Sequence, residues 1–276
     1  MATLAQWAVH NARRRLTPGR EVAVTFLDSS LRGPIDHPII NLLTYVRGGL
    51  YDYDAMTALT MLLEPGQMFI DVGANIGPYS VLAANLVGAS GQIVAIEPSA
   101  DQLPYLRRNL RDLPVESQIS TAPLADRART AGLCSEGPTI QHLVESASSD
   151  AAMVTSTLDA ELARLGRRDG GGFAKIDVEG WEPAVIAGAR GWLASRPVGL
   201  LVEANGLNHR SPVPWAESVR ILREQGYTYM WAEFSTRVLH LFSDPGPTSP
   251  FGDYLVLGPE ARERIRRRAG LRLQAA

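Results

Sequence analysis

Three short stretches of the 276-residue sequence combine acidic residues with glycines at spacings that could build a ligand site. The first reads Asp71-Val-Gly73-Ala74-Asn75-Ile-Gly77. Gly73 and Gly77 allow a tight turn and a close approach of a ligand to the backbone, and a helix that starts after Gly77 would offer free N–H groups to a carboxylate. Asp71 could meet an ammonium group or order water beside one. This stretch therefore predicts an amino-acid-like ligand that carries both a carboxylate and an amine.

A second acid, Glu97, ends the next apolar run and is followed by Pro98. A carboxylate at this place in a βαβ fold can accept hydrogen bonds from both hydroxyls of a ribose. The alternative is an exposed glutamate at a strand end. Together with the first stretch, Glu97 predicts a nucleoside joined to an amino acid, and S-adenosylmethionine is that molecule.

The third stretch alternates charged and apolar residues, Lys175-Ile-Asp177-Val-Glu179-Gly180. In a strand that is buried on both faces, charged side chains are costly unless they are paired or belong to a site. We expect at least one of the two acids to act at the reaction centre. Lys175 is the only lysine among 27 basic residues, which suggests a specific need for it or chance survival. The structural alternative is an internal ion pair, such as Lys175–Glu179, that holds the strand end.

If the acceptor of a methyl group from S-adenosylmethionine is a hydroxyl, it must lose its proton, which a positioned carboxylate or histidine can accept. The candidates for this general base are Asp177, Glu179 and His209, and His209 could instead be an exposed loop residue. A divalent cation bound by Asp177, Glu179 and Glu203 could lower the pKa of the hydroxyl in place of a base. Because the sequence reveals no tight acidic cluster, we expect no metal.

To form one site, the three stretches must be brought together by the strands and helices that carry them. Short apolar runs alternate with segments of helical periodicity, which is typical of βαβ units and a mostly parallel sheet. Ligands of such sheets bind at the carboxyl ends of the strands. We expect strands at 68–72, 92–96, 119–124, 173–178, 198–203, 227–232 and 254–257, helices at 53–63, 79–87, 102–111, 183–194 and 215–225, and loops or a hairpin at 127–156.

The composition restricts the class of protein. Hydrophobic residues make up 45% and charged residues 20%, as in soluble globular chains, and the net charge of -2 gives no broad attraction to nucleic acid or to anionic membranes. No apolar run is long enough for a transmembrane helix, and no secretory signal is evident. A single cysteine, Cys134, excludes a disulfide framework within the chain. We expect a cytoplasmic enzyme without nucleic-acid or membrane partners; a homo-oligomer is possible on these data.

The three stretches, at residues 71–77, 96–98 and 175–182, resemble the FkbM family of methyltransferases, and residues 156–159 and 201–203 are also similar to it. The resemblance implies a doubly wound α/β fold of the Rossmann-like class I methyltransferases. It implies a mostly parallel seven-stranded sheet with the strand order 3-2-1-4-5-7-6. It also implies S-adenosylmethionine as the cofactor and O-methylation of a hydroxyl on a small molecule, often a sugar or a secondary-metabolite scaffold.

The resemblance assigns roles to individual residues as well. Asp177 and Glu179 would face the methyl-transfer site, with Lys175 and His209 as further catalytic candidates. The chain departs from many relatives at Glu203-Ala204-Asn205, where they resemble Glu-Ile-His, and this leaves the general base open. The cofactor would be held by Asp71, Gly73, Ala74, Asn75, Gly77, Glu97, Pro98 and Asp177, and bordered at its adenine by the turn from Ala122 to Asp126.

Two other classes of function are weighed against this one. An NAD(P)-dependent reductase would require the third glycine of Gly-x-Gly-x-x-Gly, which is missing. A non-catalytic methyltransferase-like binding module would be expected to lose its cofactor residues, which are present.

We divide the chain into an N-terminal extension or lid (1–52), a methyltransferase domain (53–259) and a basic tail (260–276). Tyr51 and Tyr53 could cover the substrate or pack in the core.

Overall fold

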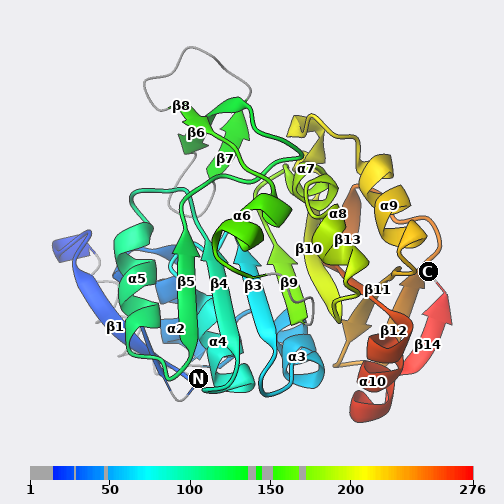
Figure 1. Cartoon of the computed structure of the whole chain (residues 1–276). Coiled ribbons are helices and arrows are strands. Elements are labelled where there is room, and N and C mark those ends of the chain that lie inside the picture. Colours follow the sequence, from blue (N-terminus) through cyan, green and yellow to red (C-terminus); the bar gives the residue numbers. More distant parts are fainter. Residues whose placement is uncertain are drawn as a thin grey trace.

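A nine-stranded sheet forms the centre of the described part of the molecule, with the order β14-β12-β11-β13-β10-β9-β3-β4-β5 (Figure 1). The structure is a computed structural model that describes residues 15–27, 29–46, 49–135, 141–144, 152–167 and 172–275. The strands are β3 (Met68–Val72), β4 (Gln92–Ile96), β5 (Glu116–Ser120), β9 (Gly172–Ile176), β10 (Gly199–Asn205), β11 (Thr228–Glu233), β12 (Val238–Phe242), β13 (Thr248–Leu257) and β14 (Arg272–Ala275). The five strands from β5 to β10 run parallel, and β13 is antiparallel to both of its neighbours.

Two of these strands were not expected from the sequence, so the predicted number of seven was too low. β12 continues from β11 in a hairpin, and β14 pairs with β12 at the edge of the sheet. Every residue of β14 is exposed, and a strand that buries no face gives no alternation of apolar and polar residues to detect. The basic segment 260–276 therefore contributes most of α10 (Pro259–Ala269) and the whole of the edge strand β14.

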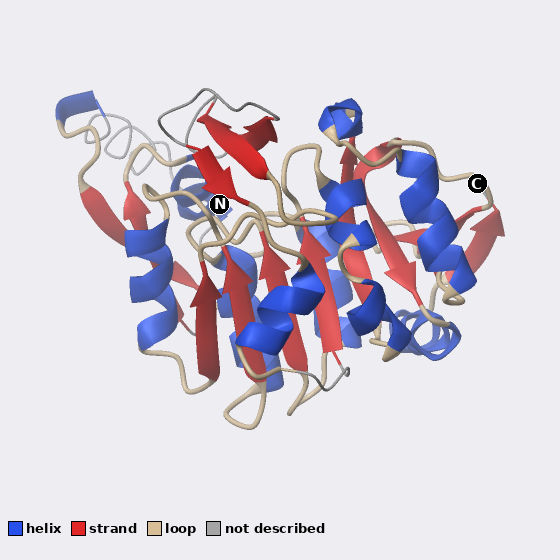
Figure 2. Ribbon diagram, turned by 45° about the horizontal axis from the view of Figure 1, so that its top comes forward, coloured by secondary structure: helices blue, strands red, loops and turns tan. Residues whose placement is uncertain are grey.

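Helices cover both faces of the sheet, as the doubly wound class requires (Figure 2). One core contains Phe69 of β3 and the apolar side chains of α3 (Tyr53–Leu62), α4 (Pro78–Val87), α5 (Leu103–Arg111) and α10. The other contains Ile70 and Val72 with those of α6 (Leu158–Arg164), α7 (Glu182–Ala187), α8 (Arg190–Ala194) and α9 (Trp215–Glu224). Successive residues of β3 thus enter opposite cores, which is why the strand reads as a continuous apolar run.

The single helix predicted at 183–194 is divided into α7 and α8. Gly188 lies at the break, where a Cβ atom would stand 2.2 Å from the carbonyl oxygen of Ala125. The carboxylate of Asp159 accepts hydrogen bonds from the backbone N–H groups of Gly191 (2.7 Å) and Trp192 (2.8 Å) and so satisfies the start of α8. The break depends on contacts with distant segments, which helical periodicity does not report.

Two small sheets complete the described structure. β1 (Glu21–Phe26) and β2 (Ser29–Pro34) form a hairpin that precedes α2 (Pro38–Val46). The segment predicted as loops or a hairpin forms a three-stranded antiparallel sheet of β6 (Thr130–Ser135), β7 (Gln141–Val144) and β8 (Ala152–Val154) above the carboxyl ends of the central strands (Figure 1). Residues 1–14 of the predicted N-terminal extension lie outside the described residues. Every helix of the described part is too short or too polar to cross a membrane.

Candidate active site

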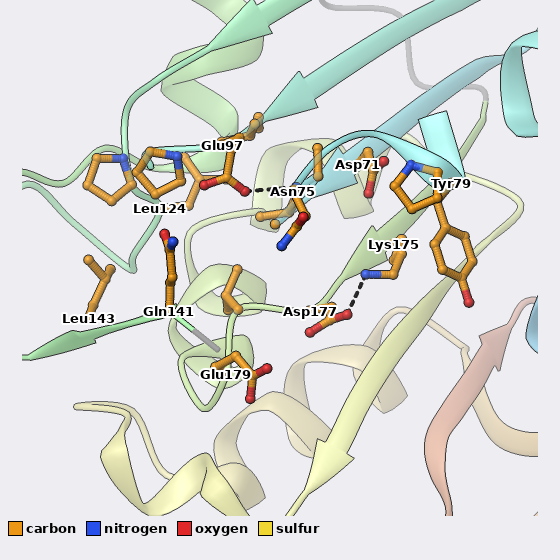
Figure 3. Close-up of a pocket in the computed structure, with 18 of the residues that line it drawn as sticks. Asp71, Asn75, Tyr79, Glu97, Leu124, Gln141, Leu143, Lys175, Asp177 and Glu179 are labelled. Atoms are coloured by element: carbon orange, nitrogen blue, oxygen red, sulfur yellow. Dashed lines mark hydrogen bonds and ion pairs between the residues drawn. The ribbon is translucent and has the colours of Figure 1, made fainter. Parts of the chain in front are cut away.

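A cavity lies at the carboxyl ends of β3, β4 and β9, and all three stretches singled out in the sequence line it (Figure 3). The structure brings together nine of the predicted site residues at its wall: Asp71, Gly73, Ala74, Asn75, Glu97, Pro98, Lys175, Asp177 and Glu179. Parallel strands all end at the same edge of the sheet, so residues that are a hundred positions apart in the sequence become neighbours.

Asp71 is buried and has one carboxylate oxygen without a partner. Its Oδ2 accepts a hydrogen bond from the hydroxyl of Ser80 at 2.6 Å, whereas its Oδ1 has no partner among the described residues. Burial raises the pKa of Asp71, and the charge of Lys175 opposes that rise. A buried acceptor that lacks a donor is costly, and an ammonium group of a ligand in the cavity would satisfy it.

Glu97 is held in a fixed orientation by two backbone N–H groups. Asn75 donates to its Oε2 and Ser99 to its Oε1, each at 2.8 Å. Each carboxylate oxygen can accept a second hydrogen bond, so the side chain retains capacity for two hydroxyl groups. Burial raises the pKa of Glu97 to about 7, against the effect of the two backbone hydrogen bonds.

The two glycines of the first stretch serve contacts within the chain. Gly73 has a φ of +80°, and a Cβ atom there would lie 1.8 Å from the carbonyl oxygen of Asp177. At Gly77 (φ +91°), a Cβ atom would lie 2.8 Å from the Cδ1 atom of Leu106. Gly77 precedes α4 and does not line the cavity. The two glycines thus allow a close approach of other parts of the chain, not of a ligand as expected. At Gly73 this contact brings the first stretch against the third.

Lys175, the first residue of the third stretch, forms an ion pair with Asp177. The alternative considered from the sequence was an ion pair with Glu179. The Nζ atom of Lys175 is 2.6 Å from Asp177 Oδ2 and 4.9 Å from the ring centre of Tyr79 (Figure 3). Burial by itself would lower the pKa of Lys175, but the carboxylates of Asp177 and Asp71 outweigh it and raise the pKa, so the side chain is charged. Strand β9 ends at Ile176, before the two acids, which lie in the following loop.

Asp177, Glu179 and Glu203 form an acidic group at one end of the site. One carboxylate oxygen of each lies within 4.8 Å of those of the other two, so these are the residues that could hold a divalent cation. Burial, followed by the charge of Asp177, raises the pKa of Glu179 to about 7. The same two causes raise the pKa of Glu203 well above its usual range. Glu179 also accepts a hydrogen bond from the side chain of Asn205 at 3.3 Å.

Besides Gly77, three predicted site residues do not line the cavity. His209 lies on the short 3-10 helix η1 (Leu207–Arg210), where it is exposed and has its Nδ1 atom 3.1 Å from the carbonyl oxygen of Gly206. Asp126 forms an ion pair with Arg129 instead of bordering a ligand. Ala122 is likewise absent from the wall, which the next two residues, Pro123 and Leu124, line.

The small three-stranded sheet supplies wall residues that the sequence did not indicate. Leu133 comes from β6, and Gln141 and Leu143 come from β7. Tyr51 lines the cavity as well, whereas the side chain of Tyr53 is largely exposed. Tyr79 also lines the cavity, and its position two residues after Gly77 could have identified it from the sequence. The residues of β6 and β7 carry no motif that would identify them.

Comparison with known proteins gives one family and several distant structures. The model of the "Methyltransferase FkbM domain" family matches residues 71–229, more than half of the chain. No curated protein matches the chain.

Among solved structures, the methyltransferase FkbM from Methylobacillus flagellatus is 17% identical with a TM-score of 0.45, and the match covers 70% of this chain and 43% of that chain. This chain thus spans less than half of that protein. Fibrillarin from Aeropyrum pernix, solved with bound S-adenosylmethionine, is 12% identical with a TM-score of 0.42 and coverages of 86% and 81%. A SAM-dependent O-methyltransferase from Thermotoga maritima is 13% identical with a TM-score of 0.40 and coverages of 87% and 76%. The family match across all three stretches, at the cavity that they line, shows that the chain belongs to the FkbM family of S-adenosylmethionine-dependent methyltransferases.

Proposed function

We propose that the protein transfers the methyl group of S-adenosylmethionine to a hydroxyl of a small molecule, on a sugar or a secondary-metabolite scaffold. The observation that carries this proposal is the division of one cavity into two chemically different ends. Asp71 and Glu97 stand toward β3 and β4, and the carboxylates of Asp177 and Glu179 stand on the loop after β9.

The residues at the first end fit the cofactor. Asp71 Oδ1 would accept a hydrogen bond from its amine, and the free capacity of Glu97 would serve the two ribose hydroxyls. The start of α4 would favour its carboxylate. Leu124 and Leu143 offer apolar surface for an adenine. Bound there, S-adenosylmethionine supplies a methyl group that its sulfonium already activates.

Glu179 is the residue that we assign as the general base. It borders the cavity, and a pKa of about 7 lets it accept a proton from a hydroxyl near neutral pH. Asp177 is bound to Lys175, which fixes its position and neutralises its charge. We assign these two residues to the alignment of the acceptor. His209 is not proposed as a base because it is exposed and does not line the cavity.

The acceptor end is acidic and is partly closed by the N-terminal segment. The carboxyl groups of Asp177 and Glu179 at the wall offer no positive charge to a phosphate-rich acceptor, which favours a small molecule over a nucleic acid. Tyr51 lines the cavity, and the adjacent Asp52 accepts a hydrogen bond from the hydroxyl of Tyr79. We therefore propose that residues 1–52 act as a lid over the methyltransferase domain that begins at Tyr53.

The test is methyl transfer to a panel of hydroxylated sugars and secondary-metabolite scaffolds, followed by mass spectrometry to locate the new methyl group. We expect Glu179→Gln to lower kcat by roughly a hundredfold or more while S-adenosylhomocysteine still binds. Parallel reactions with EDTA and with Mg²⁺ decide between this base and a cation at the three carboxylates, since only the cation mechanism loses activity in EDTA.

Three outcomes would overturn the proposal. Methylation of nitrogen or carbon would exclude O-methylation. Binding of S-adenosylhomocysteine without any transfer would indicate the non-catalytic module. Binding of NADH in its place would indicate a reductase.

A further inference from the structure

Glu182 is a fully buried carboxylate just beyond the loop that carries Asp177 and Glu179. We propose that Glu182 is a positioning residue that fixes this loop so that Glu179 faces the acceptor end of the cavity. The inference rests on the proposed function, because it assigns the role of Glu182 through the base Glu179.

The hydrogen bonds of Glu182 connect the loop to a separate element. Its Oε1 accepts from the backbone N–H groups of Val178 and Gly180, both at 3.0 Å, and these two residues flank Glu179. Its Oε2 accepts from the side-chain amide of Asn208, on η1, at 2.6 Å. One side chain thus sets the position of the residues on either side of the base and binds them to the element after β10.

The conformation of the loop explains why such a contact is needed. Glu179 has a φ of +56°, in the left-handed region that a residue with a Cβ atom rarely adopts. Gly180 follows with a φ of +115°, and a Cβ atom there would lie 2.4 Å from the carbonyl oxygen of Leu207. A non-glycine residue stays in this region only when the surrounding structure holds it there. Glu182 provides that restraint from the side of α7.

A simpler role for Glu182 would be to cap α7, since acidic residues are common in the first turn of a helix. A capping side chain accepts from the N–H groups of its own helix. The bonds of Glu182 to Val178 and Gly180 lead backward, out of the helix and into the loop. The carboxylate also meets its own backbone N–H at the start of α7, but its bonds to two residues outside the helix favour a role in holding the loop.

The chain offers a matched control for this geometry. The carboxylate of Asp159 also accepts from two backbone N–H groups, those of Gly191 and Trp192, at the start of α8. Asp159 does not line the cavity. Asp159→Leu therefore removes an equivalent pair of hydrogen bonds without touching the loop, and we expect its kcat to equal that of the native protein.

The experiment compares Glu182→Leu, Glu182→Gln, Glu179→Gln and the double variant of Glu179→Gln with Glu182→Leu. We expect Glu182→Leu to lower kcat by roughly a hundredfold, the scale of a misplaced catalytic group, with little change in the affinity for S-adenosylhomocysteine. Glu182→Gln should stay close to native, because its carbonyl oxygen can accept the same two bonds. Its amide can donate to Asn208 Oδ1, which has no partner among the described residues. The double variant should be no slower than Glu179→Gln alone, because both changes remove the same function.

An additive loss in the double variant, or an unchanged kcat in Glu182→Leu, would overturn the inference. If Glu182→Leu does not fold, Asn208→Ala replaces it in the same cycle, because it removes the bond that orients Glu182. Amide hydrogen exchange provides a readout without any acceptor: the Val178 and Gly180 amides should exchange faster in the variant, and unchanged exchange contradicts the role of Glu182. If the native protein methylates no hydroxyl, the proposed function fails while this exchange measurement still decides the role of Glu182.

Discussion

At the scale of single residues, Asp71 and Glu97 at the proposed cofactor end differ in how many hydrogen bonds their carboxylate oxygens already accept. Within the described part of the chain, Asp71 has one oxygen that accepts no hydrogen bond, whereas both oxygens of Glu97 accept one and can each accept another. Both are buried, so each is ready to accept a hydrogen bond without first displacing a shell of bulk water. The difference leads to separate predictions for the two residues.

Asp71→Ala should weaken the binding of S-adenosylhomocysteine about tenfold, which corresponds to about 1.4 kcal/mol, because the amine of the ligand loses its acceptor. Isothermal titration calorimetry measures this change. Ser80→Ala is the control, since it removes the hydrogen bond to Oδ2 and leaves Oδ1 in place. Equal losses in the two variants would show that Oδ1 is not the atom that binds the amine.

The affinity for S-adenosylhomocysteine should rise as the pH rises through about 7 and then reach a plateau, because Glu97 accepts both ribose hydroxyls only when it is ionised. A ligand that prefers the ionised form lowers the pKa of Glu97 in the complex, so binding releases a proton below that pH. Titrations from pH 5.5 to pH 8.5, about 1.5 units on either side of the pKa, measure the effect. Glu97→Gln should bind more weakly and lose this dependence, whereas Glu179→Gln should keep it. An affinity that improves toward low pH would contradict the assignment.

At the scale of elements, the site depends on two loops that touch. The loop after β3 meets the loop after β9 at Gly73, where there is no room for a Cβ atom beside the carbonyl oxygen of Asp177. On its other side, the second loop is held by Gly180 and Glu182 against η1. The cofactor end and the acceptor end of the cavity therefore keep a fixed spacing, which in-line transfer of a methyl group requires.

Gly73→Ala should lower the free energy of unfolding by ~1–3 kcal/mol more than Gly166→Ala does, because both positions have positive φ but only Gly73 is blocked. Nothing lies within 4 Å of the Cβ position at Gly166, where only the backbone strain of ~1–2 kcal/mol remains. Urea denaturation measures both values. Gly73→Ala should also weaken binding of S-adenosylhomocysteine, and equal unfolding energies for the two variants would disprove the contact.

At the scale of the whole molecule, the C-terminal segment completes the central domain. Ile265 of α10 is buried in the same core as α3 and α4. Arg264 and Arg268 donate to the carbonyl oxygens of Leu62 (3.0 Å) and Met61 (2.9 Å) at the end of α3, where the helix leaves such groups unsatisfied. Two of the arginines of this basic segment thus have a structural role.

Ile265→Ala should lower the free energy of unfolding by ~2–5 kcal/mol, because it opens a cavity in a core shared with the sheet. Arg267→Ala, at a largely exposed position on the same helix, should change it by less than ~0.5 kcal/mol. Chemical denaturation compares the two variants. Equal stability of Ile265→Ala and Arg267→Ala would show that α10 does not contribute to the core of the domain.

The sequence by itself determined the strand and helix alternation, the α/β class and nine residues of the cavity wall. These features are local. An apolar run predicts a strand, and the residue type at the strand end gives the chemical group that the side chain offers to a ligand. That is why the sequence alone identifies Asp71, Glu97 and Asp177 and predicts that they lie at one edge of the sheet.

The tertiary structure alone decided the rest, because the remaining features are contacts between segments far apart in the chain. It brought Glu203, which the sequence analysis names with Asp177 and Glu179 as a possible cation ligand, into a tight group with them, although residue spacing reveals no such cluster. It turned His209 to the surface and placed the small three-stranded sheet over the cavity. Whether a carboxylate is paired, buried or free to accept a proton depends on what surrounds it in space, and residue spacing along one chain does not contain that information.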